Sequence, residues 1–399
     1  MVEKILVVDD NEDNRNLMIC ILSELGYEVE DASDGPEAIQ KAFSYRPDLI
    51  LLDVLMPKLS GYEVCEILQK DGRTRDIPVI FLSAMGGPKD KIRGLESGGV
   101  DYITKPFNRE EVLARVAVQL KLRRLAKELF VANKGLWEKQ KRLDEDLLAA
   151  AGIQQTLLPQ KLPFGDEFAI AWKFLPSEVI GGDIFNICRL DHDTLSMYML
   201  DVSGHGVPSA LITVSVSQAL QPSDNGIMKE KISIPPYYRI LRPNKVLSYL
   251  NEEYPLERFG KLFTIIYALI DIPKGQLIYS SAGHPPPILL HPHGSMKLLE
   301  KGGPIIGLNE NIPFEEEEIW LQDGDVLLFY TDGIVEFQND EGDFYGTDRF
   351  HGLLQTLTMR PVSKLLDGIN SDLSAFGKGS KPQDDVSLLA IEYRKVRNG

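Results

Sequence analysis

The sequence predicts an α/β doubly wound parallel sheet, then a long helical connector, then an α+β domain in which two packed sheets form a sandwich flanked by helices. Three observations carry this prediction. The chain has 399 residues, whereas one domain typically has ~150. Short apolar runs alternate with helical spacing up to residue 120, and β-type runs dominate from residue 159. No proline occurs from 109 to 157. We therefore place the domains at 1–120 and 159–399, with the connector at 121–158.

The overall composition excludes several classes of protein. A formal net charge of −16 and a pI near 4.9 argue against a nucleic-acid partner. No uninterrupted apolar run reaches the ~18 residues of a membrane span, and the first ten residues, MVEKILVVDD, lack the pattern of a signal peptide. The three cysteines, at positions 20, 65 and 188, are widely spaced and suit neither a disulfide framework nor a zinc site. We expect a cytoplasmic protein without a membrane partner.

The first 120 residues predict a parallel sheet covered on both faces. Continuous apolar runs are typical of strands that are buried on both sides, and helical spacing separates them. In such a sheet, ligands bind outside the carboxyl ends of the strands. The runs lie at 4–8, 48–52, 78–83 and 101–105, and helical spacing is clear at 14–25 and 61–68.

Acidic side chains stand at those carboxyl ends. Asp9 and Asp10 follow the first run, Asp53 follows the third strand, and Ser83 and Lys105 close the next two. One aspartate after a strand is an ordinary turn residue. Three carboxylates in one crevice repel one another, however, and a divalent cation such as Mg²⁺ relieves that repulsion. A carboxylate nucleophile beside a metal, with a lysine and a hydroxyl for the phosphoryl oxygens, is a complete site for acyl-phosphate formation.

These motifs resemble the receiver domain of two-component response regulators, which has a flavodoxin-like fold. The matching segments are LVVDD, LLDVLMP, FLSA and DYITKPF. The resemblance implies a sensor histidine kinase as partner, phosphorylation at Asp53, and one Mg²⁺ in the receiver. It also implies further residue roles: metal ligation by Asp9, Asp10, Asp53 and the carbonyl of Leu55, a switch pair of Ser83 and Tyr102, and phosphoryl contact by Lys105.

The connector predicts one helix from Arg109 to about Leu157. Its apolar residues fall near a seven-residue repeat, although Lys139 and Asp146 occupy two of the expected positions and Gly135 weakens the helix. An exposed helix of this length needs a partner, so we favour a parallel homodimeric coiled coil over a helix that folds back on its own domains. The repeat comprises Leu122, Leu125, Leu129, Ala132, Leu136, Leu143 and Ala150.

The segment from 159 to 399 predicts two packed sheets with helices near 209–220 and 244–253. A proline-rich loop at 221–241 separates the two helices and is either a substrate flap or a disordered excursion. Four acidic motifs stand out: Asp183 in IGGDIF, Asp201 in LDVSGHG, Asp332 in YTDG and Asp384 in QDDVS.

Each of these four carboxylates lies at the end of an apolar run beside a small residue. Carboxylates without thiolate or imidazole ligands select hard ions such as Mg²⁺ or Mn²⁺. Two such ions would polarise a phosphoryl group and activate a water for in-line attack. A single TDG or DD is an ordinary turn, but four such motifs in this order favour a metal-dependent phosphatase. His205 and His284, which lie near these motifs, are interpreted as residues that order their loops.

The pattern resembles the PPM family of metal-dependent serine/threonine phosphatases, in the branch of the stage II sporulation phosphatase and the sigma-factor regulatory phosphatases. Further matching segments are GIQQTLLP, AGHPPP, GGPIIGL and GDVLLFYTDGIVE. The resemblance implies two Mg²⁺ or Mn²⁺ ions and a phosphorylated anti-sigma-factor antagonist protein as substrate. It assigns catalysis and metal binding to Asp183, Asp201, Asp332 and Asp384, with the Val202 carbonyl as a further ligand.

Two functions from different classes fit these motifs. One is a response regulator whose output is dephosphorylation of phosphoserine or phosphothreonine on a protein, controlled through Asp53. The other is a phosphorylation-dependent adaptor or partner-switch protein with a catalytically silent phosphatase fold. Loss of metal-binding acids would mark the adaptor, and this chain keeps all four, so we favour the enzyme.

Overall fold

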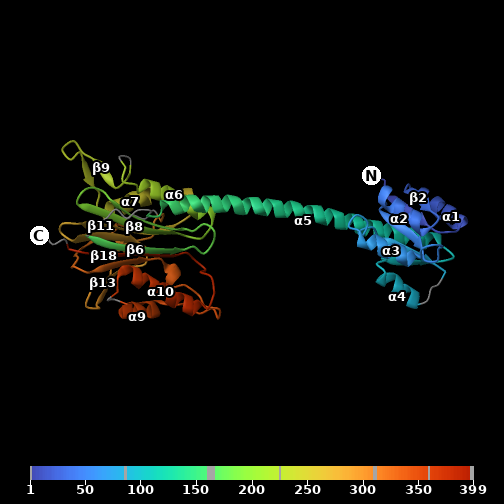
Figure 1. The fold of residues 1–399 in the computed structure, drawn as a ribbon. Coiled ribbons are helices and arrows are strands. Elements are labelled where there is room, and N and C mark those ends of the chain that lie inside the picture. The colour runs from blue at the N-terminus through green and yellow to red at the C-terminus, as the bar shows by residue number, and fades with distance from the viewer. Residues whose placement is uncertain are drawn as a thin grey trace. The chain divides into compact units, whose positions relative to one another are not determined.

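The computed structural model describes residues 2–84, 88–159, 167–223, 226–308, 312–357 and 360–395. The chain divides into two compact units, Met1–Gln140 and Lys141–Gly399 (Figure 1). The division falls inside one long helix, α5, so this helix contributes its first part to one unit and its last part to the other. Each unit has its own core, described below.

The first unit is the expected doubly wound domain. Its five strands are parallel, in the order β2-β1-β3-β4-β5. Apolar cores fill both faces of the sheet, one against α2 and α3, the other against α1 and the start of α5. The elements are β1 (Lys4–Val8), α1 (Glu12–Ser23), β2 (Glu28–Ala32), α2 (Gly35–Ser44), β3 (Leu49–Asp53), α3 (Gly61–Lys70), β4 (Val79–Ser83), α4 (Pro88–Glu96) and β5 (Asp101–Thr104).

Local sequence explains where these helices begin. The side chain of Asn11 accepts hydrogen bonds from the first turn of α1, and Ser60 and Glu63 form a reciprocal capping box at the start of α3. The strands β3 and β4 are buried at every position, which is why their apolar runs are continuous rather than alternating. Because β1, β3, β4 and β5 are parallel, the loops that follow them lie at the same edge of the sheet.

Helix α5 (Arg109–Leu157) has the expected bounds. Val112, Val116 and Leu120 are buried against the first unit, and Ala151 and Gln154 are buried in the second. Between them the helix surface is exposed, including most of the predicted heptad positions. Within the described residues, no helix combines the length and apolarity that membrane crossing requires. The exposed leucines are Leu122, Leu125, Leu129, Leu136 and Leu143.

The second unit contains the expected two sheets. One has six strands in the order β15-β12-β11-β8-β7, with β16 also paired to β12; the other has five, in the order β14-β13-β17-β18-β6. The strands are β6 (Phe168–Leu175), β7 (Asp183–Arg189), β8 (Thr194–Val202), β11 (Phe263–Asp271), β12 (Gln276–Ala282), β13 (Ile288–Leu290), β14 (Met296–Leu298), β15 (Gly302–Gly303), β16 (Glu317–Trp320), β17 (Val326–Tyr330) and β18 (Val386–Tyr393).

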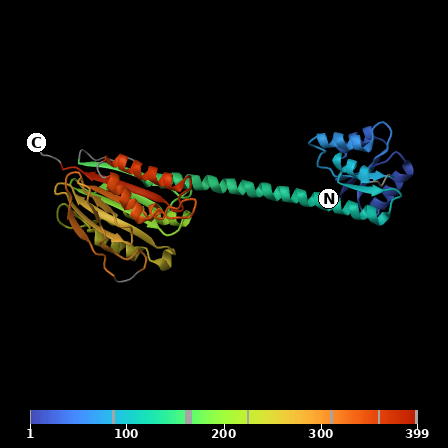
Figure 2. The same ribbon diagram turned by 90° about the horizontal axis from the view of Figure 1, so that it is seen from below.

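Helices cover the outer faces of this sandwich (Figures 1 and 2). Alternation along β18 shows the layering: Leu389 and Ile391 pack in the core between the sheets, whereas Leu388 and Ala390 pack against α9 and α10. The predicted fold class is therefore confirmed for both domains. The helices are α6 (Val207–Ala219), α7 (Pro243–Glu253), α8 (Leu256–Phe259), the 3₁₀ turn η1 (Asp332–Ile334), α9 (Thr347–Leu357) and α10 (Val362–Gly377).

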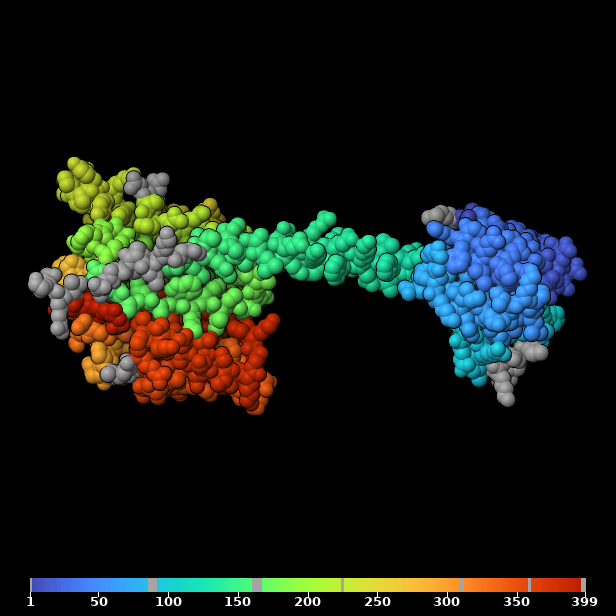
Figure 3. Space-filling view, in the orientation of Figure 1, coloured from blue at the N-terminus to red at the C-terminus, as the bar shows by residue number. Residues whose placement is uncertain are grey.

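The described part of the proline-rich segment 221–241 forms a hairpin of two short strands, β9 (Lys229–Lys231) and β10 (Tyr238–Ile240). It projects from the second unit in Figures 1 and 3. The Tyr238 hydroxyl lies 3.4 Å from Asp191 Oδ2, which ties the hairpin to the turn between β7 and β8. Asp183 and Asp201 lie at the other end of those two strands. The described residues of this segment form a hairpin rather than a disordered excursion, and the expectation that it helps to recognise substrate stays a prediction. Asp224 and Asn225 lie outside the described residues.

Candidate functional site

The first unit brings three carboxylates together at the carboxyl edge of its sheet. One oxygen each from Asp9, Asp10 and Asp53 lies within 4.8 Å of the others. Asp9 and Asp53 are buried, and Asp10 is exposed. Because parallel strands end at a common edge, residues more than 40 positions apart in sequence become neighbours there. Three converging oxygens with one exposed member are a suitable donor set for a hard divalent cation.

Lys105 completes this cluster. Its Nζ lies 2.7 Å from Asp9 Oδ2 and 2.7 Å from Asp53 Oδ2. Burial works to lower the pKa of Lys105, but the hydrogen bonds to the two carboxylates raise it overall. Burial raises the pKa of Asp53, and the hydrogen bond from Lys105 opposes that effect. The lysine thus stays charged beside the carboxylate, where it would face a phosphoryl group on Asp53.

The structure places the three other predicted receiver residues, Ser83, Tyr102 and Leu55, in different surroundings. Ser83 is buried at the end of β4, and its carbonyl accepts a hydrogen bond from the Lys105 backbone N–H. The Tyr102 ring is buried beside Phe81, and its hydroxyl has no hydrogen-bond partner among the described residues. The Leu55 N–H lies 3.5 Å from Asp53 Oδ1. A buried tyrosine hydroxyl without a hydrogen-bond partner costs free energy.

In the second unit, the four predicted acids lie at one edge of the sandwich. Asp183 begins β7 and Asp201 is near the end of β8, and the antiparallel register places them directly opposite each other. Asp332 follows β17, and Asp384 precedes β18, the strand that pairs with β17. Each sheet therefore contributes two acids to the same edge of the domain.

Asp183 is buried and held by two hydroxyl groups. Its Oδ2 accepts hydrogen bonds from Thr331 Oγ1 at 2.8 Å and from Ser387 Oγ at 2.7 Å. Burial raises the pKa of Asp183 well above its usual value, and the nearby charges of Asp201 and Asp385 raise it further. The sequence patterns assigned no role to either hydroxyl, although Thr331 is the threonine of YTDG and Ser387 is the serine of QDDVS.

Burial and negative charges raise the pKa values of Asp201, Asp332 and Asp384, and the only side chain of opposite charge that acts on them among the described residues is His205, which lowers the pKa of Asp384. Burial, followed by the charges of Asp332 and Asp384, raises the pKa of Asp201 to about 7. Burial also raises the pKa values of Asp332 and Asp384. Within the described residues, no lysine or arginine is among the groups that shift these three pKa values. Carboxylates that face one another without a lysine or arginine fit a site for divalent metal ions.

The spacing of these acids differs from that in the receiver. In the described ranges, only Asp9, Asp10 and Asp53 bring three potential ligand atoms within 4.8 Å of one another. A site for two ions ~3.5–4 Å apart needs a wider donor set, because the ligands lie on both sides of the ion pair. The Val202 carbonyl belongs to this edge, since a Cβ added to Gly182 would lie 2.8 Å from it.

Asp385 has a structural role that its neighbour Asp384 lacks. Its Oδ1 accepts from the N–H of Ser177 at 2.8 Å, and its Oδ2 accepts from the N–H groups of Gly182 at 2.6 Å and Asp183 at 3.3 Å. A Cβ on Gly181 would lie only 2.1 Å from Asp385 Oδ2, so this close approach requires glycine. The second acid of the DD pair thus holds the loop that positions Asp183.

A glutamine of the connector also holds this loop. Gln154, in the last turns of α5, is 6% exposed. Its Nε2 donates to the Gly181 carbonyl at 2.8 Å, and its Oε1 accepts from the Gly181 N–H at 3.2 Å. The connector helix therefore bonds directly to the backbone two residues before Asp183. The motif GIQQTLLP contains this residue, but its spacing does not tell which glutamine is buried.

The two histidines near the acids have defined partners. His205 Nδ1 lies 3.0 Å from Glu178 Oε1 at an exposed position. His284 is buried, with Nδ1 2.8 Å from Thr264 Oγ1, and burial lowers its pKa to about 3. Thr264 pairs with Asp201 in the sheet register, so a neutral His284 supports the strand beside this acid.

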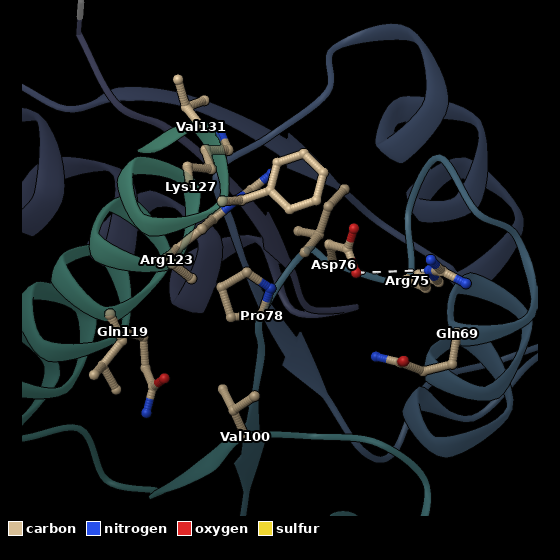
Figure 4. A pocket seen from close by; sticks show the side chains of 13 residues that line it. Gln69, Arg75, Asp76, Pro78, Val100, Gln119, Arg123, Lys127 and Val131 are labelled. Carbon is tan, nitrogen blue, oxygen red and sulfur yellow. Dashed lines mark ion pairs between the residues drawn. The ribbon is translucent and has the colours of Figure 1, made fainter. Parts of the chain in front are cut away.

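A cavity of about 720 Å³ lies in the first unit, between α5 and the amino-terminal end of β4 (Figure 4). Pro78, Val100 and Arg123 are among the residues that line it. Because Pro78 precedes β4 whereas Ser83 ends it, the cavity lies at the opposite edge of the sheet from Asp53. It therefore takes no part in the receiver's acidic cluster.

Comparison with known proteins adds two family matches. The family model of stage II sporulation protein E matches residues 191–394, which is more than half of the chain. The model of the response regulator receiver domain matches residues 5–117. The two matches do not overlap. The receiver match includes Asp9, Asp10 and Asp53, and the other match includes Asp201, Asp332 and Asp384 but begins after Asp183.

Individual relatives match one part of the chain each. The DNA-binding dual master transcriptional regulator RpaA of Synechocystis is 43% identical over 136 residues, 33% of this chain and 56% of that protein. The response regulator PleD of Caulobacter vibrioides is 47% identical over 116 residues, 29% of this chain and 26% of that protein. The chain spans about half the length of the first curated relatives it matches. The SiaA-PP2C domain of Pseudomonas aeruginosa shares the fold, with a TM-score of 0.53 and 20% identity over 64% of this chain and 98% of that one.

Proposed function

The chain belongs to the stage II sporulation protein E family, with a PPM-type phosphatase domain behind an amino-terminal receiver domain, and from this premise we propose that it is a two-component response regulator with an enzymatic output. The output is metal-dependent hydrolysis of phosphoserine or phosphothreonine on a protein, for which an anti-sigma-factor antagonist is the proposed substrate. A sensor histidine kinase is the proposed phosphodonor for Asp53. The functional segments are the receiver at 1–120, the connector at 121–158 and the phosphatase domain at 159–399.

One observation carries the enzymatic proposal: carboxylates from both sheets converge at one edge of the second unit, and no lysine or arginine is among the described groups that shift the pKa values of Asp201, Asp332 and Asp384. Asp201, Asp332 and Asp384, with the Val202 carbonyl, would hold two Mg²⁺ or Mn²⁺ ions, and Asp183 would stand beside them. When bound, such ions supply Lewis-acid activation of the phosphoryl group and of a water nucleophile. An inert adaptor would have no need to maintain this repulsion, which favours the enzyme over the silent phosphatase fold.

The chain's own residues prepare this edge. The hydroxyls of Thr331 and Ser387 both donate hydrogen bonds to Asp183 Oδ2 and so orient this carboxyl group. Asp385 and Gln154 hold the loop that carries Asp183 from two sides. The acidic edge is therefore ordered before substrate arrives, which lowers the cost of reaching the transition state.

The receiver's residues would capture the phosphoryl group. Asp53 is the nucleophile that forms the acyl phosphate, Lys105 contacts the phosphoryl oxygens, and Ser83 and Tyr102 respond to it. Asp9, Asp10 and the Leu55 carbonyl, together with Asp53, would hold one Mg²⁺. The 2.7 Å contact between Lys105 and Asp53 already places a cation where the new negative charge would develop.

We also propose that phosphorylation raises phosphatase activity through a homodimer of connector helices. The exposed leucines of α5 form the shared seam, and the helix ends in a bidentate contact with Gly181. Turnover on a phosphoserine protein should rise with beryllofluoride in the wild type. If the Leu129→Asp, Leu136→Asp variant is activated equally well, the connector is a passive tether.

The direct test of the enzymatic proposal is Mn²⁺-dependent hydrolysis of p-nitrophenyl phosphate by the full chain. Asp201→Asn removes one ligand charge and should lower turnover by about 100-fold or more. Absence of hydrolysis by the wild type at saturating Mn²⁺ would favour the adaptor. Near-normal turnover of the variant would contradict the assignment of Asp201.

A further inference from the structure

The β9–β10 hairpin and the adjoining helix α7 combine exposed lysines with exposed apolar and aromatic side chains. Lys231, at the end of β9, and Lys245, on α7, are both exposed and form no ion pair within the described residues. Three large apolar or aromatic side chains are exposed around them: Ile234 at 67%, Tyr237 at 64% and Tyr249 at 46%. The whole chain has a net charge of −16, so these two ammonium groups form a local positive feature on an acidic protein. Together these five residues define the hairpin patch.

Two hollows give the hairpin patch a shape that an extended segment could enter. One, of about 550 Å³, lies between the hairpin and α7 and is lined by Lys245 and Tyr249 among others. The second, of about 470 Å³, is lined by Lys231 and Tyr237 among others. Lys229 lines both, so the hollows adjoin at that residue. Each hollow therefore has an aromatic wall and a free lysine.

The hairpin has internal and external contacts that keep this surface in place. Arg239 pairs with Glu230 across the two strands. The Lys229 ammonium lies 4.4 Å from the centre of the Tyr238 ring and also donates to the Leu190 carbonyl. Arg239 and Lys229 therefore have partners within this part of the fold. Lys231 and Lys245 are the lysines of the hairpin patch that remain available to bind an acidic group.

The hairpin patch is separate from the acidic edge. Leu190, whose carbonyl accepts a hydrogen bond from the hairpin, directly follows β7 and lies seven residues after Asp183. Because an extended strand rises about 3.3 Å per residue, this separation corresponds to roughly 23 Å. A molecule bound in the hollows would not reach the carboxylates through the hairpin itself. The phosphate ester that is hydrolysed at the acidic edge therefore does not itself occupy the hollows of the hairpin patch.

We propose that the hairpin patch is a docking site for an acidic segment of a partner protein that also carries aromatic or large apolar side chains. Charge complementarity supports this occupant, because an acidic protein would be repelled by most of this surface and attracted locally at the two lysines. Exposed tyrosines are typical anchors of protein interfaces. Single-stranded RNA fits less well, because Glu230 and Glu252 also line the hollow beside α7 and interrupt a continuous positive path. The proposal does not depend on phosphatase activity.

The test is fluorescence anisotropy of the full chain with a fluorescein-labelled copolymer of glutamate and tyrosine, at about 50 mM salt to limit screening. Poly-glutamate, which lacks the aromatic groups, should bind the wild type more weakly than the copolymer. The Lys231→Glu, Lys245→Glu variant should bind the copolymer at least about 10-fold more weakly. The Tyr237→Ser, Tyr249→Ser variant should bind the copolymer no better than poly-glutamate.

A matched control separates local from overall charge. Lys364→Glu, Lys378→Glu changes the net charge by the same amount at exposed sites on and after α10, and it should bind the copolymer nearly as the wild type does. Equal loss of binding in both charge variants, or unchanged binding in the hairpin variant, would overturn the proposal. Tighter binding of poly-uridine than of the copolymer through the same lysines would overturn it in favour of RNA. If charge reversal lowers the thermal unfolding midpoint, Lys231→Gln, Lys245→Gln provides the same comparison with a milder change.

Discussion

Replacing Gln154 by leucine tests whether the connector helix controls the acidic edge. Leucine keeps about the same volume but removes both hydrogen bonds to Gly181, at 2.8 and 3.2 Å, and leaves the Gly181 backbone groups without those partners. Each net hydrogen bond in a buried site contributes ~0.5–1.5 kcal/mol, so the pair contributes about 1–3 kcal/mol. If that energy holds the Asp183 loop in its productive position, turnover should fall by about 5- to 150-fold, because ~1.4 kcal/mol is one factor of ten.

The assay is Mn²⁺-dependent hydrolysis of p-nitrophenyl phosphate, measured well below the unfolding midpoint. Gln155→Leu is the matched control, because this neighbouring glutamine is exposed and should leave turnover within about 2-fold of the wild type. Urea unfolding followed by tryptophan fluorescence reports mainly on the second unit, since Trp172 and Trp320 lie there. A Gln154→Leu protein that is less stable but hydrolyses ester at the wild-type rate would show that the contact only anchors the helix, and would refute its control of the acids.

Three further outcomes follow from the two acidic sites. Asp53→Asn should abolish labelling by acetyl phosphate in Mg²⁺ without changing ester hydrolysis, and stoichiometric labelling would contradict the assignment. Asp385→Asn should lower the free energy of unfolding by about 2–4 kcal/mol, because it weakens the hydrogen bonds that hold the loop. Asp384→Asn should preserve stability and raise the Mn²⁺ concentration needed for activity. The reverse pattern would show that the roles assigned to the two residues are exchanged. In EDTA, the stability of the second unit should fall as pH rises from about 4 to 7, because the folded state binds more protons when the pKa of Asp201 is raised to about 7. Urea unfolding across this range should show a weaker slope for Asp201→Asn, and an unchanged slope would refute the raised pKa.

The fold was predictable where the sequence carries a strong local pattern. Continuous apolar runs at 4–8 and 78–83 predicted buried parallel strands, because a strand covered on both faces has no polar side. The absence of proline predicted α5 with its bounds, since proline is the residue that a helix interior excludes. Segment 221–241 was not predictable in this way: its strands have three residues each, and their position depends on contacts such as Tyr238 with Asp191.

The sequence by itself determined which acids are candidates, because Asp53, Asp201 and Asp332 stand at the ends of apolar runs beside small residues. Only the tertiary structure decided what surrounds them. Asp384 and Asp385 are adjacent in the same DD pair, and their different roles depend on which carboxylate accepts the hydrogen bond from the Gly182 N–H. The hydroxyls on Asp183 and the bidentate contact of Gln154 join residues 27 to 204 positions apart. Hydrogen bonds are local in space but not in sequence, so no spacing rule along the chain can specify them.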